Sequence, residues 1–257
     1  MYPTLAGVAP ASSLTRALRI MEAVAAGGDG ITPKAIARRL GCPLPTVYRA
    51  LGTLVEQGYL VRLQEVRGYG LGYRVAELQH SLAEQVRPPA AVRTVLHEVH
   101  LELGAAAYLA TRRDADVVVA HVDDCPEHPL PPALRAGEPT PPHATAAGKA
   151  VLTGLRGPRL SELLGRVGLP ALAPHTVTDR RGLDRELRRV RAEGVAVEVE
   201  EYAAGVAGLA VPVLGPDGEV VAGLGVSVSR ADFAARRWEL ERVLRRAGST
   251  ITALPVG

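Results

Sequence analysis

Apolar residues recur at helical spacing in three segments near the start of the chain. The first predicted helix covers residues 14–26, with a buried stripe of Leu14, Leu18, Met21 and Ala25 that Ala17 and Val24 are expected to widen. A second, short helix is expected to follow Thr32, a good N-cap residue, and to end at Gly41. The third helix is predicted over 46–57, with an inward stripe of Val47, Ala50, Leu51 and Leu54.

The next segment changes from helical to strand periodicity. Residues 59–63 and 69–72 read as two short strands around a polar turn, which predicts a β-hairpin. Three helices followed by a hairpin with basic residues are typical of a winged helix-turn-helix. We therefore predict such a domain over residues 1–75, followed by a linker helix over 76–89 that ends at Pro88-Pro89.

The remainder, residues 90–257, mixes helices and strands. The predicted strands are 106–110, 117–122, 195–199, 209–214 and 220–228. The predicted helices are 90–103, 145–155, 158–167, 183–193 and 231–252. Residues 215–218, Gly-Pro-Asp-Gly, favour a hairpin turn between the last two strands. Hairpins and helices around one sheet indicate an α+β domain.

Composition narrows the class of protein. Hydrophobic residues make up 47% of the chain and there are two cysteines, which fits a globular protein of the reducing cytoplasm. Residues 1–13 lack the pattern of a secretory signal, and the apolar stretch 205–229 is broken by polar residues and prolines, so we expect no membrane association. Residues 1–80 carry nine basic and five acidic side chains, whereas the rest sums to about −1, which favours a DNA-binding head.

Residues suited to contact DNA lie on the second helix, the third helix and the hairpin. Hydroxyl, guanidinium and ammonium groups bind phosphates and base edges, and Thr46, Arg49 and Thr53 share one side of the third helix. The predicted contact residues are Lys34, Arg38, Pro45, Thr46, Tyr48, Arg49, Thr53, Arg62 and Arg67. The alternative is an amphipathic helical bundle whose outer face is only solvated.

Several ordered segments resemble one family along nearly the whole chain. These segments are 13–20 (SLTRALRI), 36–41 (IARRLG), 46–51 (TVYRAL), 143–150 (HATAAGKA), 176–179 (TVTD), 200–202 (EEY) and 210–213 (AVPV). Together they are similar to the IclR-type transcriptional regulators. The resemblance implies a C-terminal GAF-like α/β domain that binds a small, often carboxylate-bearing effector, and a homodimer or tetramer as the working unit.

The resemblance also implies where the effector binds. Carried over by motif, the pocket residues are Ala146, Ala147, Glu198, Gly208, Gly225 and Ser227. A helix that begins near Thr145 is expected to point free backbone N–H groups at an anionic ligand. Alternatively, Ala146 and Gly148 only allow close packing of a helix on the sheet.

This chain departs from the family pattern within that pocket. Related proteins commonly have a cysteine in place of Gly208, a serine in place of Gly225 and an aspartate in place of Glu198. The loss of a thiol and a hydroxyl removes polar groups and is expected to open space. We therefore predict a bulkier and less polar effector than a two- or three-carbon acid.

Other polar groupings indicate neither a metal nor a cofactor. His121, Asp123, Asp124, Cys125 and His128 lack the paired spacing of a zinc motif. Gly148-Lys149 lacks the remaining residues of a phosphate-binding loop. An acid–base pair of His143 and Glu201 would have no accompanying nucleophile.

The resulting prediction is a regulator that binds double-stranded operator DNA and is controlled by its effector. Effector binding is expected to change the relative orientation of the DNA-binding heads and thereby operator affinity. We do not predict an enzyme. Two alternatives stay open: a GAF-like enzyme that its helix-turn-helix only targets, and an adaptor protein whose helix-turn-helix no longer touches DNA.

Overall fold

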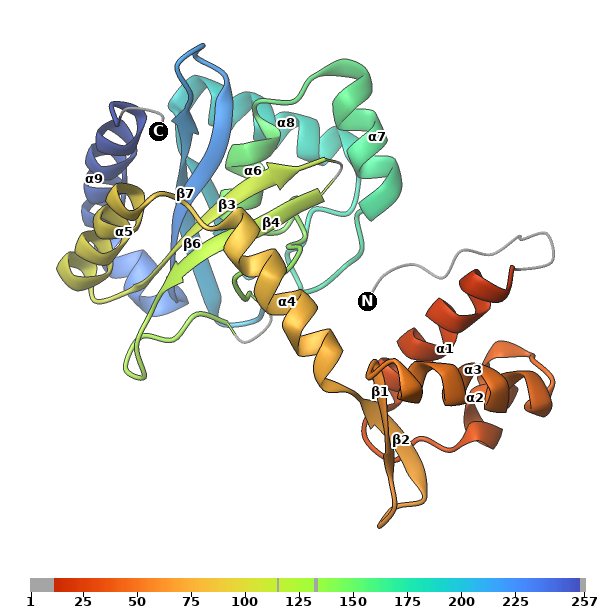
Figure 1. Cartoon of the computed structure of the whole chain (residues 1–257). Helices are drawn as coiled ribbons and strands as arrows, with labels where there is room; N and C mark the ends of the chain where they lie inside the picture. The colour runs from red at the N-terminus through yellow and green to blue at the C-terminus, as the bar shows by residue number, and fades with distance from the viewer. Residues whose placement is uncertain (1–11, 115, 132–133, 255–257) are drawn as a thin grey trace. The chain divides into compact units, whose positions relative to one another are not determined.

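A computed structural model describes residues 12–114, 116–131 and 134–254 (Figure 1). The chain divides into two compact units between Leu82 and Ala83. Residues 1–11, to which most of the expectation about a secretory signal refers, lie outside the described ranges. None of the helices that the structure describes combines the length and the apolar character needed to cross a membrane.

The described part of the first unit consists of three helices and a hairpin, as predicted. Its elements are α1 (Ser13–Gly27), α2 (Pro33–Leu40), α3 (Leu44–Glu56), β1 (Leu60–Leu63) and β2 (Gly68–Leu71). Thr32 caps α2 by accepting a hydrogen bond from the Ala35 amide, and Gly41 ends the helix in the left-handed conformation. α3 begins two residues earlier than predicted, because Pro45 fits the first turn of a helix.

The buried face of α1 differs from the predicted stripe. Leu14 and Leu18 are 69% and 47% exposed, whereas Ile20, Ala23 and Val24 are buried. The last three residues pack with Ile36, Val47, Leu51 and Leu60 to form the core of this unit. Two overlapping apolar stripes lie on α1, and only packing against α2 and α3 decides which of them is covered.

The β1–β2 hairpin is fixed to the segment that precedes α2. The amide of Tyr69 donates to the Ile31 carbonyl at 3.0 Å, and the amide of Gly30 donates to the Tyr69 carbonyl at 3.1 Å. A Cβ atom at Gly68 would lie 2.1 Å from the Gly30 carbonyl oxygen, so a larger residue there would push the strands apart. The hairpin is therefore held firmly beside the helices.

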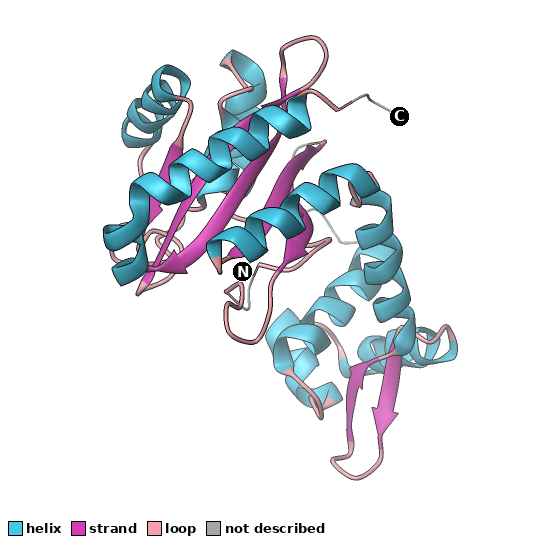
Figure 2. Ribbon diagram, turned by 90° about the vertical axis from the view of Figure 1, so that its left-hand side faces the viewer, coloured by secondary structure: helices cyan, strands magenta, loops and turns pink. Residues whose placement is uncertain are grey.

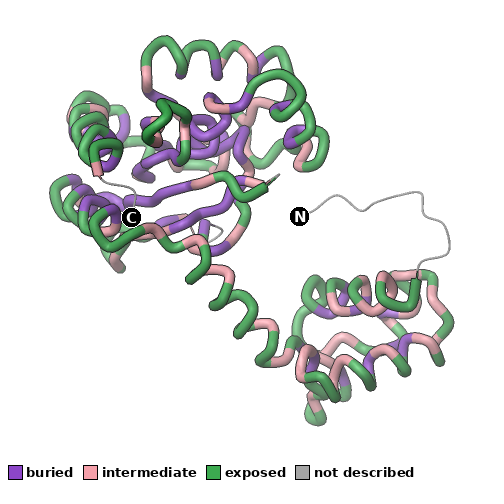
Figure 3. Tube along the Cα trace, turned by 45° about the horizontal axis from the view of Figure 1, so that its top comes forward, coloured by how far each residue is buried: buried purple, intermediate pink, exposed green. Residues whose placement is uncertain are grey.

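Helix α4 (Tyr73–Val86) follows the hairpin, each end three residues earlier than in the predicted linker helix over 76–89, and none of its residues is buried. Figure 3 accordingly colours this helix as exposed or intermediate. Its apolar side chains Tyr73 and Leu78 are 66% and 57% exposed. Val75, Leu82, Ala83 and Val86 are half-buried, so this helix is only partly covered among the described residues.

The second unit is built on a five-stranded antiparallel sheet within the described residues, in the order β4-β3-β7-β6-β5. The strands are β3 (Ala106–Arg113), β4 (Asp116–Asp123), β5 (Ala196–Val199), β6 (Val206–Leu214) and β7 (Val220–Ser229). The predicted hairpin between β6 and β7 is confirmed, with the Gly215 amide donating to the Glu219 carbonyl at 2.8 Å. This arrangement agrees with the predicted α+β domain.

Helices cover both faces of this sheet. The helices are α5 (Ala90–Leu103), α6 (Ala146–Leu152), α7 (Gly157–Val167), α8 (Arg180–Glu193) and α9 (Arg230–Thr252). α5 and α9 lie across one face, which Figure 2 shows in front, and they share a core with Ala107, Leu209 and Val226. α6, α7 and α8 share a second core with Tyr108, Ala196 and Ala210, which point to the opposite face.

Candidate functional sites

The outward face of α3 has the composition that DNA contact requires. Val47 and Leu51 are buried, so the helix presents its other faces to solvent. Pro45, Tyr48, Arg49 and Thr53 are exposed, while Thr46 is half-buried. The Thr53 hydroxyl donates to the Arg49 carbonyl at 3.3 Å, which leaves its oxygen lone pairs available. The predicted residues thus lie on an accessible surface.

Basic side chains flank α3 on both neighbouring elements. Lys34 and Arg38 on α2 are exposed, as are Arg62 on β1 and Arg67 in the turn between β1 and β2. Arg67 has a φ of 49°, so the hairpin turn places a non-glycine residue in the left-handed region. These four exposed cations give the elements before and after α3 positive charge that attracts a phosphate backbone.

Strand register brings the predicted effector residues onto one face of the second unit. Glu198 on β5 pairs with Gly208 on β6, and Gly208 pairs with Ser227 on β7. Gly225 lies two residues before Ser227 and therefore points to the same face. Ala146 and Ala147 begin α6, which packs on this face. All six residues are buried.

The space that Gly208 and Gly225 were expected to open is filled. A Cβ atom at Gly208 would lie 3.2 Å from Oε1 of Glu198, and one at Gly225 would lie 3.2 Å from Cε1 of Tyr108. The longer glutamate and a tyrosine on the neighbouring strand thus occupy the room that the glycines leave. The expectation that the two glycines open space is therefore wrong for this conformation, and the bulkier, less polar effector stays a prediction.

Some of the backbone amides at the start of α6, which were expected to be free, already have partners. The Gly148 amide donates to the Thr145 hydroxyl at 3.2 Å, and the Lys149 amide donates to the Thr145 carbonyl at 2.9 Å. The Ala147 backbone forms a hydrogen bond to the phenol of Tyr108. An anionic ligand would therefore have to replace these bonds.

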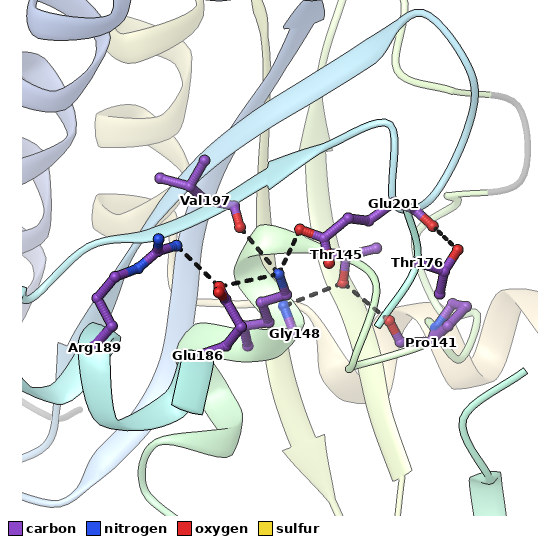
Figure 4. A network of polar contacts seen from close by, with 9 residues as sticks. Pro141, Thr145, Gly148, Thr176, Glu186, Arg189, Val197 and Glu201 are labelled. Carbon is purple, nitrogen blue, oxygen red and sulfur yellow. Dashed lines mark hydrogen bonds and ion pairs between the residues drawn. The ribbon is translucent and has the colours of Figure 1, made fainter. Parts of the chain in front are cut away.

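Lys149 is the centre of a polar network whose other members Glu186, Val197 and Glu201 are labelled in Figure 4. Its side chain has no exposed surface, and its ammonium donates to Oε1 of Glu201 at 2.6 Å and to the Val197 carbonyl at 3.1 Å. Oε2 of Glu186 on α8 lies 3.6 Å away. The lysine thus joins α6 to β5, to the segment after β5, and to α8.

Glu198 lies close to this network with little compensation of its charge. Burial, and then repulsion from Glu201, raise its pKa to about 8, so the carboxyl holds a proton at neutral pH. Burial likewise raises the pKa of Glu201, although Lys149 opposes this shift. Burial and the nearby Glu198 also raise the pKa of Tyr202, to about 12.

Sequence reasoning did not identify Tyr108, Lys149 and Tyr202 as neighbours of Glu198. Tyr108 pairs with Gly225 across β3 and β7, and this register was not assigned from the sequence. Side chains alternate along a strand, so Ala106 and Tyr108 of β3 lie on the same face of the sheet. This alternation is the sequence signal from which the position of Tyr108 could have been inferred. Lys149 was considered only as part of a phosphate loop, and no local pattern indicates that its partner is Glu201.

Of the groups weighed for metal or acid–base chemistry, Cys125 and His128 contact each other at 3.6 Å between Sγ and Nδ1, and several others have different partners. His143 Nε2 lies 3.0 Å from the Pro170 carbonyl oxygen, and Glu201 pairs with Lys149, so the two residues do not form a pair with each other. Asp123 contacts His97, and Asp124 accepts a hydrogen bond from the Leu130 amide. Among the described residues, no three His, Cys, Asp or Glu side chains are arranged to hold a metal ion.

A winged helix-turn-helix combined with an α/β unit of this topology defines a ligand-responsive DNA-binding regulator. The model of the IclR helix-turn-helix domain matches residues 13–64, and that of the bacterial transcriptional regulator IclR C-terminal domain matches residues 80–253. The chain belongs to the IclR family of transcriptional regulators. It therefore has a DNA-binding domain and an effector-binding domain.

Known relatives span most of the chain. The HTH-type transcriptional regulator Rv1719 of Mycobacterium tuberculosis is 32% identical, covering 90% of this chain and 87% of its own length. The transcriptional repressor IclR of Escherichia coli is 27% identical, covering 84% and 79%. An IclR homologue from Microbacterium hydrocarbonoxydans, solved with 4-hydroxybenzoate, has a TM-score of 0.70 at 25% identity and covers 94% of this chain and 98% of its own.

Proposed function

We propose that this regulator binds its operator through the outward face of α3 and that a small organic acid controls the affinity. The observation that carries the proposal is the exposure of Tyr48, Arg49 and Thr53 on a helix anchored by buried Val47 and Leu51. A helix presented in this way fits the major groove, while Arg62 and Arg67 of the hairpin lie beside it for the phosphates.

The effector is proposed to bind where α6 meets β5, β6 and β7. Ala146, Ala147, Glu198, Gly208, Gly225 and Ser227 are the proposed contact residues, and their position on one face of the sheet supports this. The complex of the Microbacterium homologue with 4-hydroxybenzoate supports a carboxylate-bearing ligand. Because α6 and Glu198 fill this region, binding requires a rearrangement, and that rearrangement supplies the two states of the switch.

We further propose that the protein acts in the cytoplasm as a homodimer or tetramer, with a DNA-binding domain over residues 1–75, a linker helix over 76–89 and an effector domain over 90–257. Exposed Leu14 and Leu18 on α1, together with the partly covered α4, support self-association, since apolar helix faces are normally buried. Membership of a family of transcriptional regulators supports a function as a regulator rather than as an enzyme.

Fluorescence anisotropy with the full-length protein tests this proposal. The probe is the DNA upstream of the protein's own gene, and a shuffled duplex of equal composition is the control, both measured over a series of salt concentrations. We expect the upstream duplex to bind at least about a thousandfold more tightly than the shuffled one. Equal affinity for the two duplexes would refute sequence-specific binding at this operator.

A further inference from the structure

Two buried carboxylate oxygens beside α6 have no hydrogen-bond partner. They are Oε2 of Glu198 and Oε2 of Glu201, and the Glu198 residue is only 3% exposed. Buried polar atoms in proteins are nearly always hydrogen-bonded, because an unpaired one loses its hydration without compensation. At Glu198 the unpaired atom also belongs to the proposed effector site, so a bound ligand is a natural partner for it.

The cation nearest to these carboxyl groups is already engaged. The Lys149 ammonium donates to the Val197 carbonyl and to Oε1 of Glu201, and it forms an ion pair with Oε2 of Glu186 at 3.6 Å. A ligand carboxylate placed against Glu198 would therefore share this cation with two carboxyl groups of the protein. A ligand with a donor group would instead satisfy the unpaired oxygen of Glu198.

We propose that the effector presents a hydrogen-bond donor, a hydroxyl or an ammonium group, to Oε2 of Glu198, and that its carboxylate faces away from this side chain. The inference rests on the proposed effector site and specifies which chemistry that site selects. Gly208 on β6 and Ser227 on β7 follow Glu198 in the strand register on the same face of the sheet, so they border the position of the donor group.

The raised pKa of Glu198 is consistent with this assignment. Burial without a partner raises the pKa, and a donor that binds the carboxyl oxygen would replace part of the lost hydration. Because the carboxyl of Glu198 holds a proton at neutral pH, it has an uncharged oxygen that can accept a hydrogen bond from a ligand donor.

Matched ligands that differ only in the donor test the proposal by isothermal titration calorimetry on the full-length protein. One series compares 4-hydroxybenzoate with 4-methoxybenzoate, and 4-(aminomethyl)benzoate with 4-ethylbenzoate. A second series, on an aliphatic skeleton, compares 4-aminobutyrate and 4-hydroxybutyrate with pentanoate. We expect the donor-bearing member to bind at least about tenfold more tightly in one series or both. No donor preference in either series, or no binding throughout, overturns the proposal.

Variants then assign the preference to Glu198. Glu198→Met keeps the length of the side chain but removes the acceptor, and it should reduce the donor advantage to less than about threefold. Glu198→Gln keeps an acceptor oxygen without the charge, and it should retain the preference for the hydroxyl better than that for the ammonium. Glu200→Gln is the matched control, because the oxygens of Glu200 already accept from Arg230 and Gly205. A donor advantage that survives in Glu198→Met overturns the assignment.

Operator binding separates this inference from the proposed function. If ligands of either series change operator affinity but show no donor preference, the proposed function as an effector-controlled regulator is supported and the inference about Glu198 fails. If donor-bearing ligands bind through Glu198 but leave operator affinity unchanged, the inference about ligand recognition by Glu198 is supported. The proposal that a ligand at this site controls operator binding is then contradicted.

Discussion

The Lys149 ammonium lies 2.6 Å from a carboxylate oxygen of Glu201, although the lysine side chain has no exposed surface. Charges are removed from water at a high free-energy cost, and this pair is supported by a second bond to the Val197 carbonyl. Because α6, β5 and the segment after β5 all meet at this ammonium, it fixes the frame within which the proposed effector residues are held.

Replacing Lys149 should strongly destabilise the second unit. Lys149→Met leaves Glu201 buried without its partner, and we expect a loss of about 3 kcal/mol in the free energy of unfolding, measured by urea denaturation. Arg180→Met is the control, because Arg180 and Asp184 form an exposed pair whose loss should change stability by less than about 0.5 kcal/mol. Combining Lys149→Met with Glu201→Leu should recover part of the loss, and equal losses in the single and double variants would contradict this explanation.

Glu198 should make the protein less stable as the pH rises. The folded state holds the proton up to a pKa of about 8, whereas the unfolded chain releases it near 4.5, so stability falls with increasing pH between these values. Glu198→Gln removes this dependence and should stabilise the protein by on the order of 2 kcal/mol at the alkaline end, with little gain near pH 4.5.

Denaturation series over this pH range measure the difference between wild type and Glu198→Gln. Glu200→Gln is a control of opposite sign. The hydrogen bond from the Gly205 backbone and, after it, the charge of Arg230 lower the pKa of Glu200, so its stabilising contribution is present above the ordinary pKa and is lost on acidification. A gain from Glu198→Gln that does not vary with pH would show that its cause is packing rather than titration.

Arg49 on α3 should contribute to operator binding without affecting the effector. Arg49→Ala removes an exposed guanidinium from the outward face of the helix, and we expect operator affinity to fall at least about tenfold in anisotropy measurements. Arg188→Ala, an exposed arginine on α8, is the control and should leave operator binding unchanged. Loss of effector binding with unchanged operator affinity would place Arg49 outside the DNA interface.

Gly223 should be intolerant of any side chain. A Cβ atom there would lie 2.4 Å from the Ala147 carbonyl oxygen, so Gly223→Ala would separate β7 from α6 and should lower stability by about 3 kcal/mol. Gly165→Ala on α7 is the matched control, because nothing lies within 4 Å of the added Cβ atom. It should raise stability by about 0.5–1 kcal/mol, since alanine favours helix more than glycine does. Melting temperatures of the two variants that shift in the same direction would contradict the packing argument.

The order of elements could be predicted where local signals are strong. Thr32 and Gly41 mark the ends of α2, and the Gly-Pro-Asp-Gly turn joins β6 to β7, because capping and turn residues act on their immediate neighbours. The stripe chosen for α1 was wrong, since Leu14 and Ile20 both fit a helical period and only the position of α2 and α3 distinguishes them. The contact residues on α3 and around Glu198 stay predictions.

By itself, the sequence determined the class of the protein, its two-part organisation, and which helix turns a basic, hydroxyl-bearing face outward. These properties follow from periodicity, caps and ordered motifs, which are local along the chain. Only the tertiary structure decided that Lys149 meets Glu201, that Tyr108 and Glu198 fill the space left by two glycines, and that Oε2 of Glu198 has no partner. Such contacts depend on strand register and helix placement, which bring together residues far apart in sequence and therefore leave no local trace in it.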